Sequence, residues 1–212
     1  MLVSPSLLSA DFSKLEDECK RIQAAGADWL HLDVIDGVFA PNITFGVPVV
    51  KALRSKTDMV FDLHLMITEP LKYIENFAAV GADFITFHIE SKSDPAATIK
   101  KIHDCGLKAG VALKPGTPLE AVKPYLDMAD MILIMTVEPG FSGQKFMADM
   151  MPKLKELSSL CAGEDKYIQV DGGVNTDNAR LVAENGANVV VGGNSVFCAE
   201  DPKAVIDCFH SY

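Results

Sequence analysis

Short apolar runs alternate with longer segments of helical periodicity along the chain. Eight runs predict strands, at residues 3–8, 29–34, 59–65, 83–88, 108–113, 131–135, 167–170 and 188–191. Helices are expected between and after them, near residues 13–25, 46–55, 70–80, 95–105, 118–126, 147–161, 176–185 and 202–210. Strands that alternate with helices in this way are typical of a parallel sheet covered by helices.

Several residues mark where the predicted helices begin. Ser13 followed by Glu16 has the spacing of a capping box, in which each side chain accepts a backbone N–H of the first turn. Pro70 and Pro202 each follow an acidic residue, and proline is favoured in the first helical turn. These signals support the predicted starts of three helices.

A short internal repeat supports one βα unit used many times. Gly26-Ala27-Asp28, Gly81-Ala82-Asp83 and Gly186-Ala187-Asn188 each end a predicted helix and open a strand. Eight such units fit an α/β fold of the single-domain (β/α)8 barrel type over residues 1–212. The main alternative, a doubly wound open sheet, usually carries a Gly-x-Gly-x-x-Gly turn after its first strand, and no glycine follows the first strand here.

Composition narrows the class of partner. The formal net charge is −10 and no block of lysine or arginine occurs, so nucleic acid and anionic membranes are not expected as partners. The start of the chain does not resemble a signal peptide, and no apolar run approaches the ~18 residues needed to span a bilayer. Five scattered cysteines without Cys-x-x-Cys spacing predict reduced thiols and a cytoplasmic location.

Polar side chains interrupt three of the predicted strands. His31 and Asp33 are two residues apart and therefore share a face, while His64 and Asp171 stand near the ends of two other strands. Burying such groups without partners costs about 1–3 kcal/mol each. Two imidazoles and two carboxylates suit Zn²⁺, Fe²⁺, Co²⁺ or Mn²⁺ better than Ca²⁺, with Zn²⁺ preferred for its abundance. His88, in a similar position, is expected to be a satisfied core residue.

Glycine-rich stretches follow the sixth, seventh and eighth predicted strands. In (β/α)8 barrels the loops after strands seven and eight commonly bind phosphate through backbone N–H groups. The sequence therefore predicts a phosphate site that needs no lysine. Its candidate residues are Gly140, Phe141, Ser142, Gly143, Gly172, Gly173, Gly193, Asn194 and Ser195.

These groups together suggest proton transfer on a small phosphorylated sugar. A metal ion would stabilise the oxyanion that forms when a neighbouring C–H proton leaves. One of Asp33 and Asp171 would remove that proton and the other would return one to the opposite face, inverting a stereocentre. Met66 and Met135 lie near the expected mouth and could form an apolar lid.

The chain resembles the ribulose-phosphate 3-epimerase family over essentially its whole length. The segments that carry the resemblance are SPSLLSADF at 4–12, HLDVIDGVFAPNITFG at 31–46, HLM at 64–66, VEPGFSGQ at 137–144 and VDGGV at 170–174. The resemblance implies interconversion of D-ribulose 5-phosphate and D-xylulose 5-phosphate through an enediolate. It also implies His31, Asp33, His64 and Asp171 as metal ligands, with Asp33 and Asp171 as the acid/base pair. Ser6, His64 and Met66 are expected at the substrate, and the glycine loops at its phosphate. The last loop departs from the family's usual turn by carrying Asn194.

Three alternatives stay open. A 3-epimerase of a six-carbon ketose phosphate, such as allulose 6-phosphate, would share the same metal and aspartates. Related phosphate-binding barrels that decarboxylate or condense use an Asp-x-Lys motif, whereas Asp62 is followed here by Leu63 and His64. A non-enzymatic scaffold would not need both histidines and both aspartates. A homo-oligomer, either a dimer or a hexamer, is expected because related barrels commonly form one.

Overall fold

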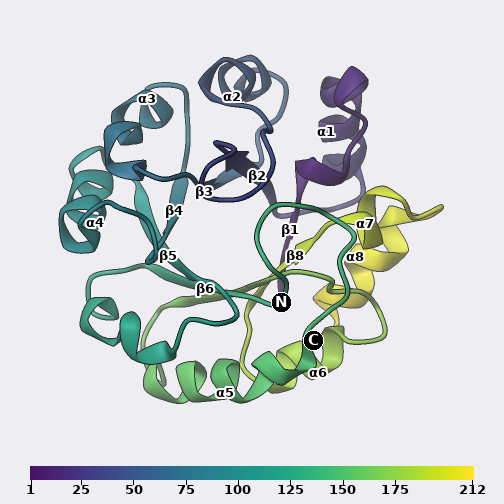
Figure 1. Ribbon diagram of the computed structural model, residues 1–212. Helices are drawn as coiled ribbons and strands as arrows, with labels where there is room; N and C mark the ends of the chain where they lie inside the picture. The colour runs from purple at the N-terminus through teal and green to yellow at the C-terminus, as the bar shows by residue number, and fades with distance from the viewer.

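Eight parallel strands follow one another around a barrel in the computed structural model, which describes residues 1–212 (Figure 1). Each strand pairs with its neighbours in the order β1-β8-β7-β6-β5-β4-β3-β2. A parallel bridge between Ser6 and His31, and the Asp28 N–H donated to the Val3 carbonyl at 3.1 Å, join β1 to β2 and close the barrel. The strands are β1 (Leu2–Pro5), β2 (Trp29–Ile35), β3 (Val60–Met66), β4 (Phe84–His88), β5 (Lys108–Leu113), β6 (Met131–Met135), β7 (Tyr167–Asp171) and β8 (Val189–Gly192). The predicted (β/α)8 barrel is confirmed.

The helices form a ring outside the strands (Figure 1). They are α1 (Leu15–Ala24), α2 (Val47–Arg54), α3 (Ile74–Ala78), α4 (Pro95–Asp104), α5 (Met151–Leu160), α6 (Ala179–Glu184), α7 (Asn194–Phe197) and α8 (Pro202–His210). The segment near 118–126, predicted as one helix, forms two 3₁₀ turns, at Leu119–Ala121 and Lys123–Tyr125. Pro124 lacks the N–H that a continuous α-helix would need there. The short helix α7 was not predicted as a separate element.

The predicted capping box at Ser13 is wrong. Asp11 Oδ1 accepts hydrogen bonds from the Ser13 N–H at 2.9 Å and the Ser13 hydroxyl at 2.6 Å, so Ser13 is a donor. Asp11 caps a 3₁₀ turn at Phe12–Lys14, and α1 starts after that turn without a side-chain cap. By contrast, Asp201 caps α8 as its position before Pro202 indicates, because its Oδ1 accepts the Ala204 N–H at 3.1 Å.

The Gly-Ala-Asp/Asn repeat has a physical explanation. Each glycine has a positive φ, 98° at Gly26, 95° at Gly81 and 101° at Gly186, which ends the preceding helix. The acidic or amide side chain two residues later then accepts a backbone N–H at the start of the neighbouring strand. These bonds run from Val3 to Asp28 at 2.7 Å, from Phe61 to Asp83 at 2.8 Å and from Ile168 to Asn188 at 2.8 Å.

The barrel interior is layered, and it becomes polar toward the carboxyl ends of the strands. The first layer is apolar, with Trp29, Phe84, Met131 and Val189 from the even-numbered strands in one buried cluster. The next layer, from odd-numbered strands, contains the buried polar residues Ser4, Asp62 and Gln169. Above it lie buried histidines and an aspartate. The main apolar core, 45 buried residues, lies instead between the sheet and the helices.

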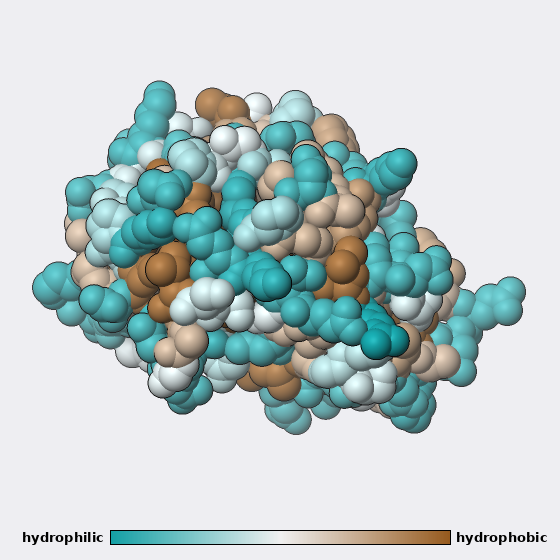
Figure 2. Space-filling model, turned by 90° about the horizontal axis from the view of Figure 1, so that it is seen from below, coloured by the Kyte–Doolittle hydropathy of each residue, from teal (hydrophilic) through white to brown (hydrophobic).

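The side of the molecule shown in Figure 2 is mostly hydrophilic. The side of the barrel over α5 and α6, seen in Figure 2, shows apolar atoms only in small separate groups. No helix is both long enough and apolar enough to cross a membrane.

Candidate metal centre and active site

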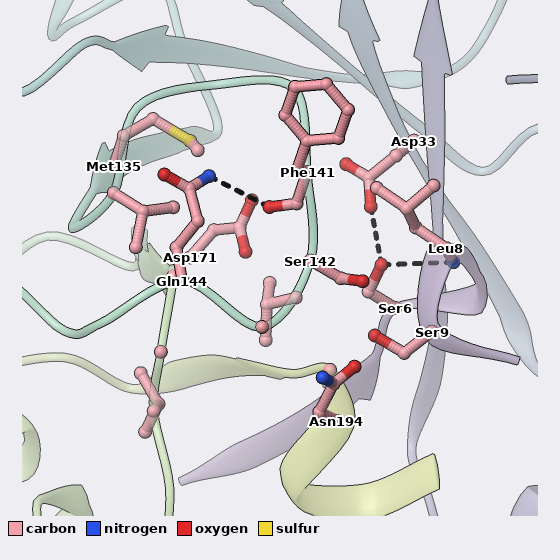
Figure 3. A pocket seen from close by; sticks show the side chains of 18 of the residues that line it. Ser6, Leu8, Ser9, Asp33, Met135, Phe141, Ser142, Gln144, Asp171 and Asn194 are labelled. Atoms are coloured by element: carbon pink, nitrogen blue, oxygen red, sulfur yellow. Dashed lines mark hydrogen bonds between the residues drawn. The ribbon is translucent and has the colours of Figure 1, made fainter. Parts of the chain in front are cut away.

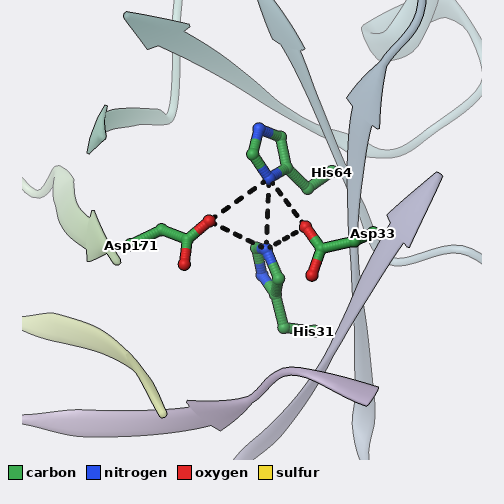
Figure 4. A group of neighbouring side chains, drawn as sticks. All are labelled: His31, Asp33, His64 and Asp171. Carbon is green, nitrogen blue, oxygen red and sulfur yellow. Dashed lines mark hydrogen bonds and ion pairs between the residues drawn. The ribbon is translucent and has the colours of Figure 1, made fainter. Parts of the chain in front are cut away.

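Four predicted ligands converge at the carboxyl end of the barrel (Figure 4). Asp33 Oδ1 lies 3.2 Å from His31 Nε2 and 3.0 Å from His64 Nδ1. Asp171 Oδ2, on the opposite side of the cluster, lies 3.9 Å from His31 Nε2 and 3.6 Å from His64 Nδ1. The two ring nitrogens are 3.3 Å apart. Three strands, β2, β3 and β7, supply these side chains.

The spacing of the four ligand atoms fits a small divalent ion. All four lie within 4.8 Å of one another. Ligands about 2.0–2.1 Å from a tetrahedral Zn²⁺ are separated from each other by about 3.3 Å, and the five distances given above lie between 3.0 and 3.9 Å. The donor set, two imidazoles and two carboxylates, is also one that transition metals accept. The cluster can therefore hold a metal ion.

The electrostatics of the cluster show strong mutual interaction. Burial opposes a charge on Asp33, but the imidazoles of His31 and His64 outweigh it and hold the pKa of Asp33 well below its usual range. Burial likewise opposes a charge on His31, yet Asp33 and Asp62 raise the pKa of its imidazole. Burial, followed by the charge of Asp33, raises the pKa of Asp171 to about 6. The two carboxylates therefore differ in their affinity for a proton.

Asp62 supports the cluster from beneath, and it was not among the predicted site residues. Its Oδ2 accepts hydrogen bonds from His31 Nδ1 at 2.7 Å, Ser4 Oγ at 3.0 Å and Gln169 Nε2 at 2.6 Å. All four residues are buried. Asp62 and Gln169 each stand two residues before a predicted site residue on the same strand, and Ser4 stands two before Ser6, just past the end of β1, so the period of two could have revealed them.

His88 is fully buried, as expected, but it also contacts the cluster. Its Nε2 lies 2.9 Å from His64 Nε2, on the side of the His64 ring away from the other ligands. Its Nδ1 lies 3.1 Å from Glu90 Oε2. Glu90 gave no signal in the sequence, since it stands just beyond the end of β4.

A cavity of about 350 Å³ opens beside the ligand cluster (Figure 3). Its wall includes Asp33 and Asp171 together with every predicted substrate residue except His64, which lies fully buried beneath it with His31. Ser6 Oγ donates to Asp33 Oδ2 at 2.5 Å. The residues that the sequence singled out and that line the cavity are Ser6, Asp33, Met66, Met135, Gly140, Phe141, Ser142, Gly143, Asp171, Gly172, Gly173, Gly193, Asn194 and Ser195.

The far wall of the cavity is built from the three glycine-rich loops. A Cβ on Gly143 would lie 2.7 Å from Asn194 Nδ2, and one on Gly173 would lie 2.6 Å from the Phe146 backbone nitrogen. The loops after β6, β7 and β8 therefore approach as closely as glycine permits. No lysine or arginine lines the cavity. The buried hydroxyls of Ser9 and Ser195 have no hydrogen-bond partner, which leaves them free for a ligand.

Fold and site together define a (β/α)8-barrel enzyme whose catalytic end carries a cluster able to hold a metal ion. The sequence places it more narrowly. The chain belongs to the ribulose-phosphate 3 epimerase family, whose profile matches residues 2–197. It is 48% identical over 203 residues to the ribulose-phosphate 3-epimerase of Synechocystis sp., covering 94% of this chain and 88% of that protein. It is also 48% identical to the chloroplastic ribulose-5-phosphate-3-epimerase of Arabidopsis thaliana, covering 95% and 73%. The chain is thus an epimerase, and so an isomerase.

Solved structures of other barrels share the fold. The 3-hexulose-6-phosphate synthase of Salmonella typhimurium superposes with a TM-score of 0.72 over 100% of this chain and 97% of that one, at 18% identity. That likeness shows the barrel alone. The Asp-x-Lys motif expected of such enzymes is absent, since His64 follows Asp62 by two positions and joins the ligand cluster.

Proposed function

We propose that this chain interconverts D-ribulose 5-phosphate and D-xylulose 5-phosphate by moving a proton at C3. The observation that carries the proposal is the placement of Asp33 and Asp171. They lie on opposite sides of the ligand cluster, and both line the cavity. Two carboxylates so placed can reach the two faces of one carbon atom.

His31, Asp33, His64 and Asp171 would hold the ion, and Zn²⁺ is the proposed metal because it accepts imidazole and carboxylate donors and is abundant. When bound, the ion would stabilise negative charge on the substrate oxygens beside C3. Fe²⁺, Co²⁺ and Mn²⁺ accept the same donors.

The two aspartates would exchange roles with the direction of the reaction. In one direction, the ionised aspartate takes the C3 proton and leaves an enediolate. The other aspartate, which is protonated, then delivers its proton to the opposite face of C3. The reverse reaction uses the same two groups in the opposite order, so each ends in the state in which the other began. Ser6 would hold Asp33 in orientation through the hydrogen bond to its Oδ2.

The rest of the cavity would position the substrate. Backbone N–H groups of the loops around Gly143, Gly173 and Gly193 would bind the phosphate, together with Ser195. Met66 and Met135, which are almost completely buried, would form the apolar wall near the reacting carbon and limit access of water.

We also propose an oligomeric state and a location. A homo-oligomer, dimer or hexamer, and a cytoplasmic location are expected for this chain, although the Arabidopsis relative is named as chloroplastic. The relatives named above lend no support to a six-carbon ketose phosphate as substrate.

The proposal is tested by NMR of ribulose 5-phosphate incubated with the zinc-loaded protein in D₂O. Xylulose 5-phosphate should form, with deuterium at C3. Zinc-loaded protein that gives neither product nor exchange would refute the pentose assignment. Allulose 6-phosphate, tested in parallel, would then show whether the six-carbon alternative holds.

A further inference from the structure

A series of polar contacts leads away from the ligand cluster, through the buried His64 and His88 to the partly exposed Glu90. The Nε2 atoms of His64 and His88 are 2.9 Å apart, whereas the ring centroids are 5.0 Å apart with 25° between the ring planes. The two rings therefore meet edge to edge, in the geometry of a hydrogen bond. On the other side of His88, Nδ1 lies 3.1 Å from Glu90 Oε2.

The direction of these hydrogen bonds follows from Glu90, where the series of contacts ends. An ionised carboxylate only accepts hydrogen bonds, so the neutral His88 ring must carry its proton on Nδ1, facing Glu90. Its Nε2 is then an acceptor. His64 must donate to it from Nε2, which leaves the lone pair of His64 Nδ1 directed at the ligand cluster.

We propose that Glu90, acting through His88, is a positioning residue that selects the metal-binding tautomer of His64. The inference rests on the proposed metal centre. A histidine that binds a metal through one nitrogen normally donates its other N–H to a partner that fixes the ring. Here that partner is a second histidine, whose own tautomer is determined by a carboxylate two residues further along the chain.

Glu90 is held so that its carboxylate cannot simply be replaced by an amide. Its Oε1 accepts the Lys114 N–H at 2.8 Å and also the Thr117 hydroxyl. In Glu90→Gln, the amide oxygen must take the place of Oε1. An NH₂ group there would face the Lys114 N–H, and two donors cannot form a hydrogen bond. The NH₂ would then face His88 Nδ1 and drive the His88 proton to Nε2, where it opposes the His64 N–H.

The surroundings keep water away from the contact between the two histidine rings. His64 and His88 are both fully buried, and the Phe39 ring packs against His88 with a centroid distance of 4.8 Å. Water is therefore not at hand to replace a mismatched donor or acceptor.

The test measures zinc affinity by competition with a chromophoric chelator, for the wild-type protein and Glu90→Gln. Affinity should fall about 10- to 100-fold in the variant. The matched control is Asp130→Asn, which also removes a carboxylate that accepts from a histidine and a backbone N–H, in this case His103 and Ala109. It lies outside the metal centre, so its zinc affinity should stay within about twofold of the wild type.

A second measurement needs no variant. In zinc-loaded protein labelled with ¹⁵N-histidine, long-range ¹H–¹⁵N correlation spectra report which ring nitrogen carries the proton. Protons on His64 Nε2 and His88 Nδ1 are expected, and a proton on His88 Nε2 would overturn the inference. Unchanged zinc affinity in folded Glu90→Gln would also overturn it while leaving the metal centre intact. A wild-type protein that binds no zinc would refute the metal centre itself.

Discussion

Asp62 Oδ2 lies 2.7 Å from His31 Nδ1, while the other nitrogen of the same ring faces the ligand cluster. Asp62 thus contacts the outer nitrogen of His31, just as the His88–Glu90 pair contacts the outer nitrogen of His64. Each of the two proposed histidine ligands has a polar group behind it, which is a carboxylate for His31 and a histidine in contact with a carboxylate for His64. The site therefore extends below the four ligands into the polar middle layer of the barrel.

Replacing Asp62 by asparagine should weaken metal binding. Asparagine removes the negative charge behind His31, and its NH₂ group would have no acceptor at the position of Oδ1, which has no partner in the native protein. We expect about 10- to 100-fold lower zinc affinity, measured by chelator competition. The control is Thr86→Val, another buried polar site on the barrel interior whose hydroxyl has no partner. An Asp62→Asn affinity equal to that of the control would contradict this role.

Zinc affinity should depend on pH with two different slopes. Burial raises the pKa of Asp171 to about 6, and the charges of Asp33 and Asp62 raise the pKa of His31 above its usual value despite burial. Raised pKa values mean that both groups hold protons in the metal-free protein at pH values where free side chains would release them. A metal must displace those protons.

A proton on His31 competes with the metal on both sides of pH 6, and below about pH 6 a proton on Asp171 competes as well. The affinity should therefore fall more steeply with falling pH below about 6 than just above it. Isothermal titration with zinc between about pH 5 and 8, in non-coordinating buffers, measures these slopes. A pH-independent affinity would show that neither group holds a proton in the metal-free cluster.

A methyl group at Gly173 should damage phosphate binding. Gly173 has a φ of 67°, and a Cβ there would lie 2.6 Å from the Phe146 backbone nitrogen, so Gly173→Ala would separate the loops after β6 and β7. We expect the KM for ribulose 5-phosphate to rise at least about tenfold, the equivalent of about 1.4 kcal/mol of binding.

The matched control is Gly106→Ala. Gly106 has a similar φ of 78°, but a Cβ there would meet nothing within 4 Å. Its backbone strain should lower the melting temperature without changing KM. Equal KM values in the two variants would place the phosphate elsewhere.

Periodicity was sufficient to predict the barrel, because strands and helices alternate regularly and each βα unit repeats the same local chemistry. Its errors occurred where a local hydrogen bond decided the structure. Asp11 accepts the Ser13 N–H and caps a 3₁₀ turn ahead of α1, so Ser13 does not cap α1, and Pro124 divides a helical segment into two turns. The pattern of apolar residues shows neither of these effects.

The site was predictable where it depends on strand ends and glycine loops. Its supporting residues were missed for two reasons. Asp62 looked like one more polar residue in a strand, and its role depends on the pairing of β2 with β3, which sets His31 opposite Asp62. Glu90 lies outside any strand, and only the edge-to-edge approach of His64 and His88 connects it to the ligands.

Proton exchange in single variants tests most directly whether Asp33 and Asp171 act on opposite faces of C3. Asp33→Asn and Asp171→Asn, each shown to contain zinc, would be incubated in D₂O with ribulose 5-phosphate and, separately, with xylulose 5-phosphate. Each variant should exchange the C3 proton of one epimer only, the two variants should differ in which epimer that is, and neither should epimerise. Exchange of the same epimer by both variants, or near-normal epimerisation by either, would contradict the two-aspartate account.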